Sequence, residues 1–158
     1  PAHETTSLRG RSLPLEQLAP LAAIPDVTLV SLQRGHGEEQ LQHCSFRDRF
    51  SAAQAEMSAV WAFDDMAAIV EQCDLVISSD SAMVHLAAGL GCPTWLLLRA
   101  IPEWRWGLEG EQSFWYPSLR LFRQAVDGDW AGLIARVAAC LSEQIQAGAI
   151  RRRPLDPC

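Results

Sequence analysis

Two short apolar runs, residues 75–77 and 94–98, constrain the fold of this chain more than any other feature of its sequence. Continuous apolar runs of this length are typical of strands that are buried on both faces of a parallel sheet. Residues 81–90 lie between the runs and have the apolar spacing of a helix, which Gly91 ends and Pro93 keeps from continuing. A strand, a helix and a second strand at this spacing predict a right-handed crossover unit of an α/β domain.

The rest of the chain shows further helical and strand-like patterns. We expect helices over residues 14–24 and 130–145, and a further helix that starts near residue 38. Another helix is expected from residue 64 onward, with Asp64 or Asp65 as its cap. Residues 27–32 and 119–123 are expected to form strands, and residues 44–57 a loop or short irregular helix. The predicted domain spans residues 1–148, and residues 149–158 are expected to form a disordered tail.

Composition limits the classes of protein to which the chain can belong. With 158 residues, 49% of them hydrophobic, it fits one globular domain with its own core. A net charge of -6 argues against a general nucleic-acid binder, which needs clustered positive charge. No apolar stretch is long enough to cross a bilayer and the N-terminus has no leader pattern, so we expect a cytoplasmic protein. Five cysteines without a Cys-x-x-Cys pair predict reduced thiols.

The turn after the first apolar run, residues 80–83, has the chemistry of a ligand site. In open parallel sheets, ligands bind beyond the carboxyl ends of the strands, where helix N-termini point free N–H groups outward. If the helix begins at Ser81, the N–H groups of Ser81, Ala82 and Met83 are free to bind a phosphate. Ser81 and His85 share a helix face, and Asp80 can accept a hydrogen bond from a sugar hydroxyl. These residues predict a site for a phosphate and a sugar.

Other interpretations of these residues stay open or fit less well. Asp80 can equally be the helix cap, with Ser81 as a surface hydroxyl and His85 as a partly buried imidazole, and the local pattern does not decide between the two. A hydrolase triad of the same three residues is disfavoured, because the turn lacks the flanking glycines of a nucleophile elbow. The histidines are scattered along the chain, so we expect no metal site.

An aromatic segment follows the second predicted strand and contains Trp104, Trp106, Trp115 and Tyr116. Aromatic faces suit stacking on a base or a sugar. We favour the simpler interpretation, in which this loop packs over the edge of the sheet.

Residues 80–88 (DSAMVHLAA), followed by Gly91, Cys92, Pro93 and a strand, resemble the donor-site signature of glycosyltransferase family 9, which contains the lipopolysaccharide heptosyltransferases. Residues 102–106 (PEWRW), 115–124 (WYPSLRLFRQ) and 128–130 (GDW) are similar to the branch that is fused to tetratricopeptide repeats. The resemblance covers roughly residues 6–141, the extent of one domain. It implies a three-layer Rossmann-like domain with a parallel sheet, corresponding to the C-terminal, donor-binding half of a GT-B glycosyltransferase. The N-terminal, acceptor-binding half has no match in this chain.

The resemblance also implies roles for residues outside the turn. Thr6, Ser7 and Arg11 match the family's hydroxyl pair and cationic residue, which contact the donor diphosphate. Arg11 stands where the family usually has Lys, a change that keeps the charge but alters the geometry. Glu39, after a Gly-His-Gly loop, and Trp61 fall where relatives hold the nucleoside.

At the turn itself, the resemblance implies that Asp80, Ser81, Ala82 and His85 take the phosphate and sugar of the donor. Ser81 stands where Thr is commoner in the family, and Ala82 where Gly is common. The implied function is the donor-binding half of an inverting, metal-independent glycosyltransferase, which binds a nucleoside-diphosphate sugar, needs no cofactor and takes its base from the other half. The alternative is a catalytically silent module that retains the fold for ligand sensing or protein interaction.

Overall fold

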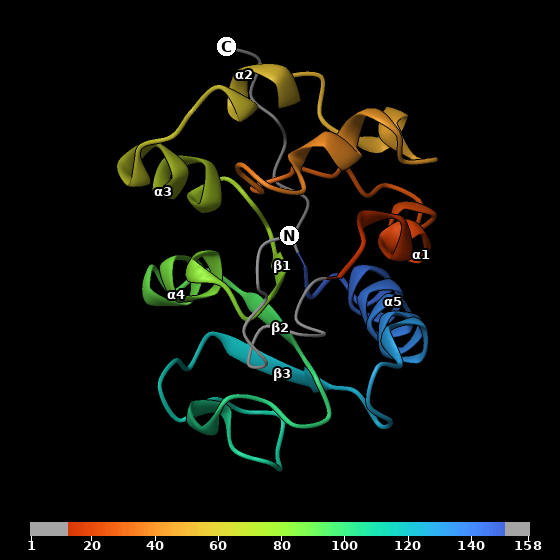
Figure 1. The fold of residues 1–158 in the computed structure, drawn as a ribbon, viewed down its shortest axis with the longest axis vertical. Helices are drawn as coiled ribbons and strands as arrows, with labels where there is room; N and C mark the ends of the chain where they lie inside the picture. The colour runs from red at the N-terminus through yellow and green to blue at the C-terminus, as the bar shows by residue number, and fades with distance from the viewer. Residues whose placement is uncertain (1–12, 151–158) are drawn as a thin grey trace, which may run out of the picture.

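A computed structural model describes residues 13–150 of the chain (Figure 1). At the centre of these residues is a parallel sheet in the order β1-β2-β3, formed by Val76–Ser79, Thr94–Leu98 and Leu119–Arg123. β2 pairs with β1 on one side and β3 on the other, and all 5 of its residues are buried. The α/β class with a parallel sheet is therefore confirmed, as is the doubly buried strand predicted at residues 94–98.

The other elements are helical. They are η1 (Leu15–Leu18), α1 (Ala19–Ala22), η2 (Glu38–Gln42), η3 (Arg47–Arg49), α2 (Gln54–Ser58), α3 (Phe63–Glu71), α4 (Ala82–Gly89), η4 (Trp104–Trp106) and α5 (Trp130–Gln146), where η denotes a 3-10 helix. The helix predicted over residues 14–24 is divided between η1 and α1, and the one predicted from residue 38 is η2. The long helix predicted over residues 130–145 is confirmed as α5.

Helices cover both faces of the sheet, with α4 and α5 on opposite sides (Figure 1). Trp95 and Leu97 of β2 belong to the core that includes α5 and α1. Leu96 and Leu98 of the same strand pack against α4 and the buried Trp106 of η4. Successive side chains of β2 therefore point to opposite faces of the sheet, as they do in any strand, and each face is covered by one of the two cores.

Residues 27–32 do not form the predicted strand. In the described chain, Leu29 makes one isolated parallel bridge to Phe50, while the N–H and C=O of Ser31 bond to the side chain of Gln54 at 2.8 and 3.1 Å. The prediction was wrong because these backbone groups pair with the segment that follows η3 and not with β1. The apolar side chains are still used, since Val27 and Leu32 pack against two of the cores.

The starts of two helices also differ from prediction. α3 has Ala62 as its N-cap, so Asp64 and Asp65 lie in the first turn instead of capping it. Carboxylates in that turn still interact favourably with the helix dipole. α4 begins at Ala82 with Ser81 as the N-cap, and β1 continues through Ser79, which pairs with Leu97. The turn predicted at residues 80–83 is therefore the junction of β1 and α4.

Candidate functional site

The junction of β1 and α4 leaves backbone N–H groups at the start of the helix. Ser81 has an extended backbone, with φ -143° and ψ 170°, and its side chain makes no cap hydrogen bond to α4. Its hydroxyl lies 3.0 Å from that of Ser78 instead. The Val84 N–H donates to the Ser81 carbonyl at 3.2 Å, whereas the Ala82 and Met83 N–H groups precede any intrahelical acceptor. These two groups are the amides that a phosphate can use.

A small hollow lies beside this turn, at the carboxyl ends of β1 and β2. It is lined by Ser79, Asp80, Leu97, Leu98, Arg99, Pro102, Glu103 and Trp130. Open α/β sheets bind ligands at this end of their strands. The hollow therefore lies next to the turn, at the carboxyl end of the sheet. Its lining includes charged side chains of both signs, namely Asp80, Arg99 and Glu103.

His85 is held by the aromatic segment that follows β2. Its Nδ1 lies 3.0 Å from the hydroxyl of Tyr116, and its ring stacks on Trp106 with centroids 5.5 Å apart and planes inclined by 25°. The imidazole is half-buried, as the structural interpretation of the sequence allowed. Because Ser81 bonds to Ser78 and His85 to Tyr116, the described structure gives no Ser-His hydrogen bond of a hydrolase triad.

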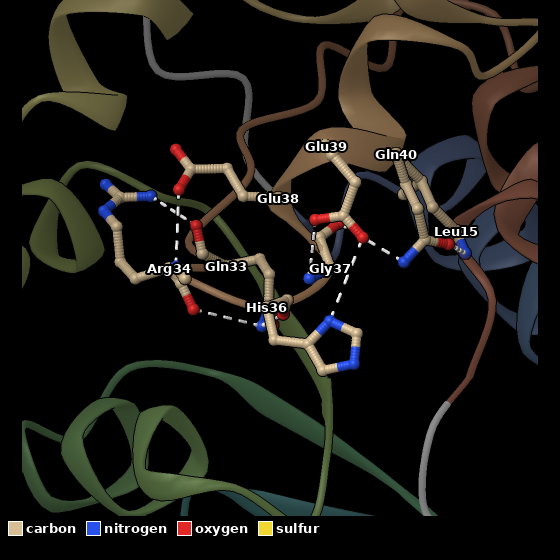
Figure 2. A network of polar contacts seen from close by, with 9 residues as sticks. Leu15, Gln33, Arg34, His36, Gly37, Glu38, Glu39 and Gln40 are labelled. Carbon is tan, nitrogen blue, oxygen red and sulfur yellow. Dashed lines mark hydrogen bonds and ion pairs between the residues drawn. The ribbon is translucent and has the colours of Figure 1, made fainter. Parts of the chain in front are cut away.

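Glu39 folds back onto the glycine loop that precedes it (Figure 2). Its carboxylate accepts the Gly37 N–H at 2.9 Å and lies 3.9 Å from Nδ1 of the exposed His36. Gly35 and Gly37 have φ values of 70° and 96°, a left-handed conformation that glycine adopts without strain. The loop thus turns sharply and presents the Glu39 carboxylate at its surface.

Arg34 connects this loop to the segment that carries Trp61. Its guanidinium donates to the carbonyl of Val60 at 2.8 Å and to that of Met57. Trp61 follows directly and exposes 67% of its surface. The predicted nucleoside residues Glu39 and Trp61 are thus carried by two segments that Arg34 joins. Nothing in the sequence pattern singled out Arg34, because Val60 and Met57 are 26 and 23 residues away from it along the chain.

Three further predicted residues, Thr6, Ser7 and Arg11, lie outside the described residues. The predicted site residues that the structure describes therefore form two groups. One contains Asp80, Ser81, Ala82, Met83 and His85 around the start of α4, and the other contains Glu39 and Trp61.

The aromatic segment packs along the outer edge of β3, as its simpler interpretation predicts. Gln112 forms an antiparallel bridge with Arg120, and Trp106 is buried with 4% of its surface exposed. Its outer side chains remain in solvent, since Trp104 and Phe114 are 80% and 92% exposed. The segment therefore protects an edge strand and also displays aromatic surface.

Arg123 at the end of β3 holds the aromatic segment in place. Its guanidinium donates to the carbonyls of Trp106, Gly107, Glu109 and Gly110 at 2.6, 3.0, 3.3 and 3.3 Å. Burial lowers the pKa of this guanidinium from its usual value. A single side chain thus orders a loop that has little regular secondary structure. Sequence reasoning missed this role because an Arg in a strand gives no signal of the carbonyls it will meet.

Within residues 13–150, no three His, Cys, Asp or Glu side chains are grouped so that they could hold a metal ion. The helices in that part of the chain are all too short or too polar to span a membrane.

Comparison with known proteins identifies the family. The model of glycosyltransferase family 9 (heptosyltransferase) matches residues 25–114, and the chain therefore belongs to that family. Protein FlbA of Caulobacter vibrioides is 33% identical over 131 residues, which cover 82% of this chain and 22% of that protein. The chain thus spans less than a quarter of this relative's length. No solved structure matches the chain.

Proposed function

We propose that this chain binds a nucleoside-diphosphate sugar and is the donor-binding half of an inverting, metal-independent glycosyltransferase of the GT-B type. In this proposal the N–H groups of Ala82 and Met83 bind the diphosphate, and Asp80 accepts a hydrogen bond from a sugar hydroxyl. Ser81 and His85 complete the site around the start of α4. Membership of glycosyltransferase family 9 supports the reaction class.

The observation that carries the proposal is the uncapped start of α4. Helix N-termini combine unpaired N–H groups with partial positive charge, and both favour a phosphate. A side chain that capped the helix would compete for those N–H groups, but the hydroxyl of Ser81 is paired with Ser78. The turn also lies at the end of the sheet where α/β proteins bind nucleotides.

The rest of the donor extends beyond this turn in our proposal. Glu39 and Trp61 hold the nucleoside, and Thr6, Ser7 and Arg11 contact the diphosphate. An N-terminal acceptor-binding half supplies the carboxylate base that activates the acceptor hydroxyl. We also propose that the whole protein contains this half and tetratricopeptide repeats, and that it lies in the cytoplasm. The relative FlbA, of which this chain covers 22%, supports the existence of longer proteins that contain such a domain.

Calorimetric titration of the chain with ADP, GDP and UDP, and then with their sugar conjugates, tests the proposal. We expect saturable binding of at least one nucleoside diphosphate without added metal. Replacing His85 or Arg11 with Ala should weaken that binding about tenfold, since each loses a hydrogen bond to a charged group. Absence of binding by the wild-type chain would contradict the proposed function.

Matched variants on the surface control for general effects of charge and folding. His43→Ala and Arg47→Ala change the same residue types at exposed positions. His43 follows η2, and Arg47 is the first residue of η3. Both should bind like the wild type. If the wild type binds a nucleoside diphosphate and both His85→Ala and Arg11→Ala bind it with the same affinity, the assigned site residues are wrong. The proposal that the chain binds nucleotides would still stand.

A further inference from the structure

The contact between His85 and the aromatic segment is specific and connects two parts of the chain that lie 31 residues apart. The hydroxyl of Tyr116 meets Nδ1 of His85 at 3.0 Å, and the two rings touch edge to face with centroids 5.8 Å apart. Trp106 stacks on the imidazole. The ring of His85 therefore has a stacking partner and a hydrogen-bond partner, which together fix its orientation.

The geometry points to Tyr116 as a positioning residue that sets the tautomer of His85, so that Nε2 carries the hydrogen and donates to the leaving diphosphate. This inference rests on the proposed function and deepens it. A neutral imidazole has one N–H donor and one acceptor nitrogen, and the hydrogen bond made by one nitrogen determines the role of the other. Tyr116 thus acts through His85.

The direction of the hydrogen bond follows from the chemistry of its two groups. A phenol is a moderately acidic O–H donor, and an unprotonated imidazole nitrogen is a good acceptor. If Tyr116 donates to Nδ1, the hydrogen of the neutral ring must reside on Nε2. In the described chain Nδ1 is the ring nitrogen with a hydrogen-bond partner, so Nε2 is the one left for a ligand. An N–H at this position suits an anionic oxygen, whereas a lone pair would repel it.

Tyr116 is itself held firmly enough for this task. Its ring packs against the core between α4 and the sheet, and its N–H donates to the hydroxyl of Ser113 at 3.3 Å. The hydroxyl of Ser118 donates to the carbonyl of Ala88 in α4 at 3.0 Å, so the segment is tied to α4 at a second point. Pre-organised neighbours of this kind keep a binding group in its productive orientation.

Nitrogen NMR of the His85 ring at pH 8 tests the inference without a ligand. In the wild-type chain we expect Nδ1 to show the chemical shift of an unprotonated nitrogen and Nε2 that of a protonated one. In Tyr116→Phe, which keeps the ring and removes the hydroxyl, the Nδ1 shift should move toward the average of two tautomers. A protonated Nδ1 in the wild type would overturn the inference, whether or not the variant folds.

Titration with the nucleoside diphosphate that the wild type binds best, among ADP, GDP and UDP, gives the second readout. Tyr116→Phe should bind about three- to tenfold more weakly, the effect of one misplaced hydrogen bond. Ser118→Ala is the matched control, because it loosens the same segment without touching the imidazole, and it should bind like the wild type. Equal affinity of Tyr116→Phe and wild type, or equal loss in both variants, would overturn the positioning role.

The two proposals fail in different ways. If the wild type binds none of the three nucleoside diphosphates, the proposed function fails, and the role of His85 toward a diphosphate fails with it. If the wild type binds one of them and Tyr116→Phe shows neither the tautomer change nor the affinity loss, only the inference about Tyr116 fails.

Discussion

Helices α4 and α5 both begin beyond the carboxyl end of a strand, yet their first turns are built differently. In α5 the carboxylate of the N-cap, Asp129, accepts the Gly132 N–H at 2.8 Å, and the Gly128 N–H is taken by the side chain of Gln124 at 2.9 Å. In α4 the N-cap Ser81 makes no such bond. The N-cap side chain therefore binds a first-turn N–H group in α5 but not in α4.

The two helices also differ in what they bury. α5 has 17 residues and contributes Leu133, Ile134, Val137 and Leu141 to the largest core, whereas α4 has 8 residues and an exposed start. Burial of apolar surface is the main source of stability, and an exposed polar turn adds little to it. We therefore assign a structural role to α5, whereas the start of α4 is left for the binding role that we propose, and substitutions can separate the two.

The largest expected effect is on α5. Ile134 is fully buried, so Ile134→Ala should reduce the free energy of unfolding by about 2–5 kcal/mol. Chemical denaturation followed by circular dichroism measures this change. The folded fraction should bind a nucleoside diphosphate like the wild type. A loss of affinity in folded protein would show that the two helices do not have separate roles.

The N-cap of α5 should give a smaller effect. Asp129→Ala removes the side chain that accepts the Gly132 N–H and should cost about 1 kcal/mol in the free energy of unfolding. The same denaturation experiment checks it. Affinity for a nucleoside diphosphate should not change, because Asp129 serves only its own helix. A cost near zero would mean that the cap contributes nothing to stability, and the contrast with α4 would disappear.

The matched substitution at α4 should have the smallest effect on stability. Ser81→Ala removes the hydroxyl contact to Ser78 but no cap, so the free energy of unfolding should fall by less than about 0.5 kcal/mol. Comparing its denaturation midpoint with that of Asp129→Ala tests the difference directly. If Ser81→Ala were as destabilising as Asp129→Ala, Ser81 would be a structural cap.

Features fixed by local pattern were predictable from the sequence. The apolar run at Thr94–Leu98 and the periodicity of α5 gave the right elements, because burial on both faces and helical spacing leave direct traces in the sequence. The run at residues 27–32 has a similar pattern, but it does not pair with a strand of the sheet. Its backbone groups bond to Gln54 and to the residues around Phe50, and such distant partners leave no local trace.

The candidate site divides in the same way. The turn at residues 80–83 was predictable because it is a continuous strand-to-helix junction. The environment of His85 was not, since Tyr116 and Trp106 reach it only after the chain has passed through β2. The carbonyls that Arg123 binds were equally hidden, because a guanidinium that serves four backbone oxygens of a loop has no sequence spacing to reveal it.

The measurement that tests the central claim most directly is nucleoside diphosphate binding by Ala82→Pro. Proline fits the first position of a helix and the extended Ser81 before it, so the fold should persist while one N–H is removed. Ala82→Gly keeps that N–H and serves as the control. We predict that calorimetry gives about a tenfold or greater loss of affinity in Ala82→Pro and wild-type affinity in Ala82→Gly. Equal affinity of Ala82→Pro and wild type would contradict the claim that the start of α4 binds the diphosphate.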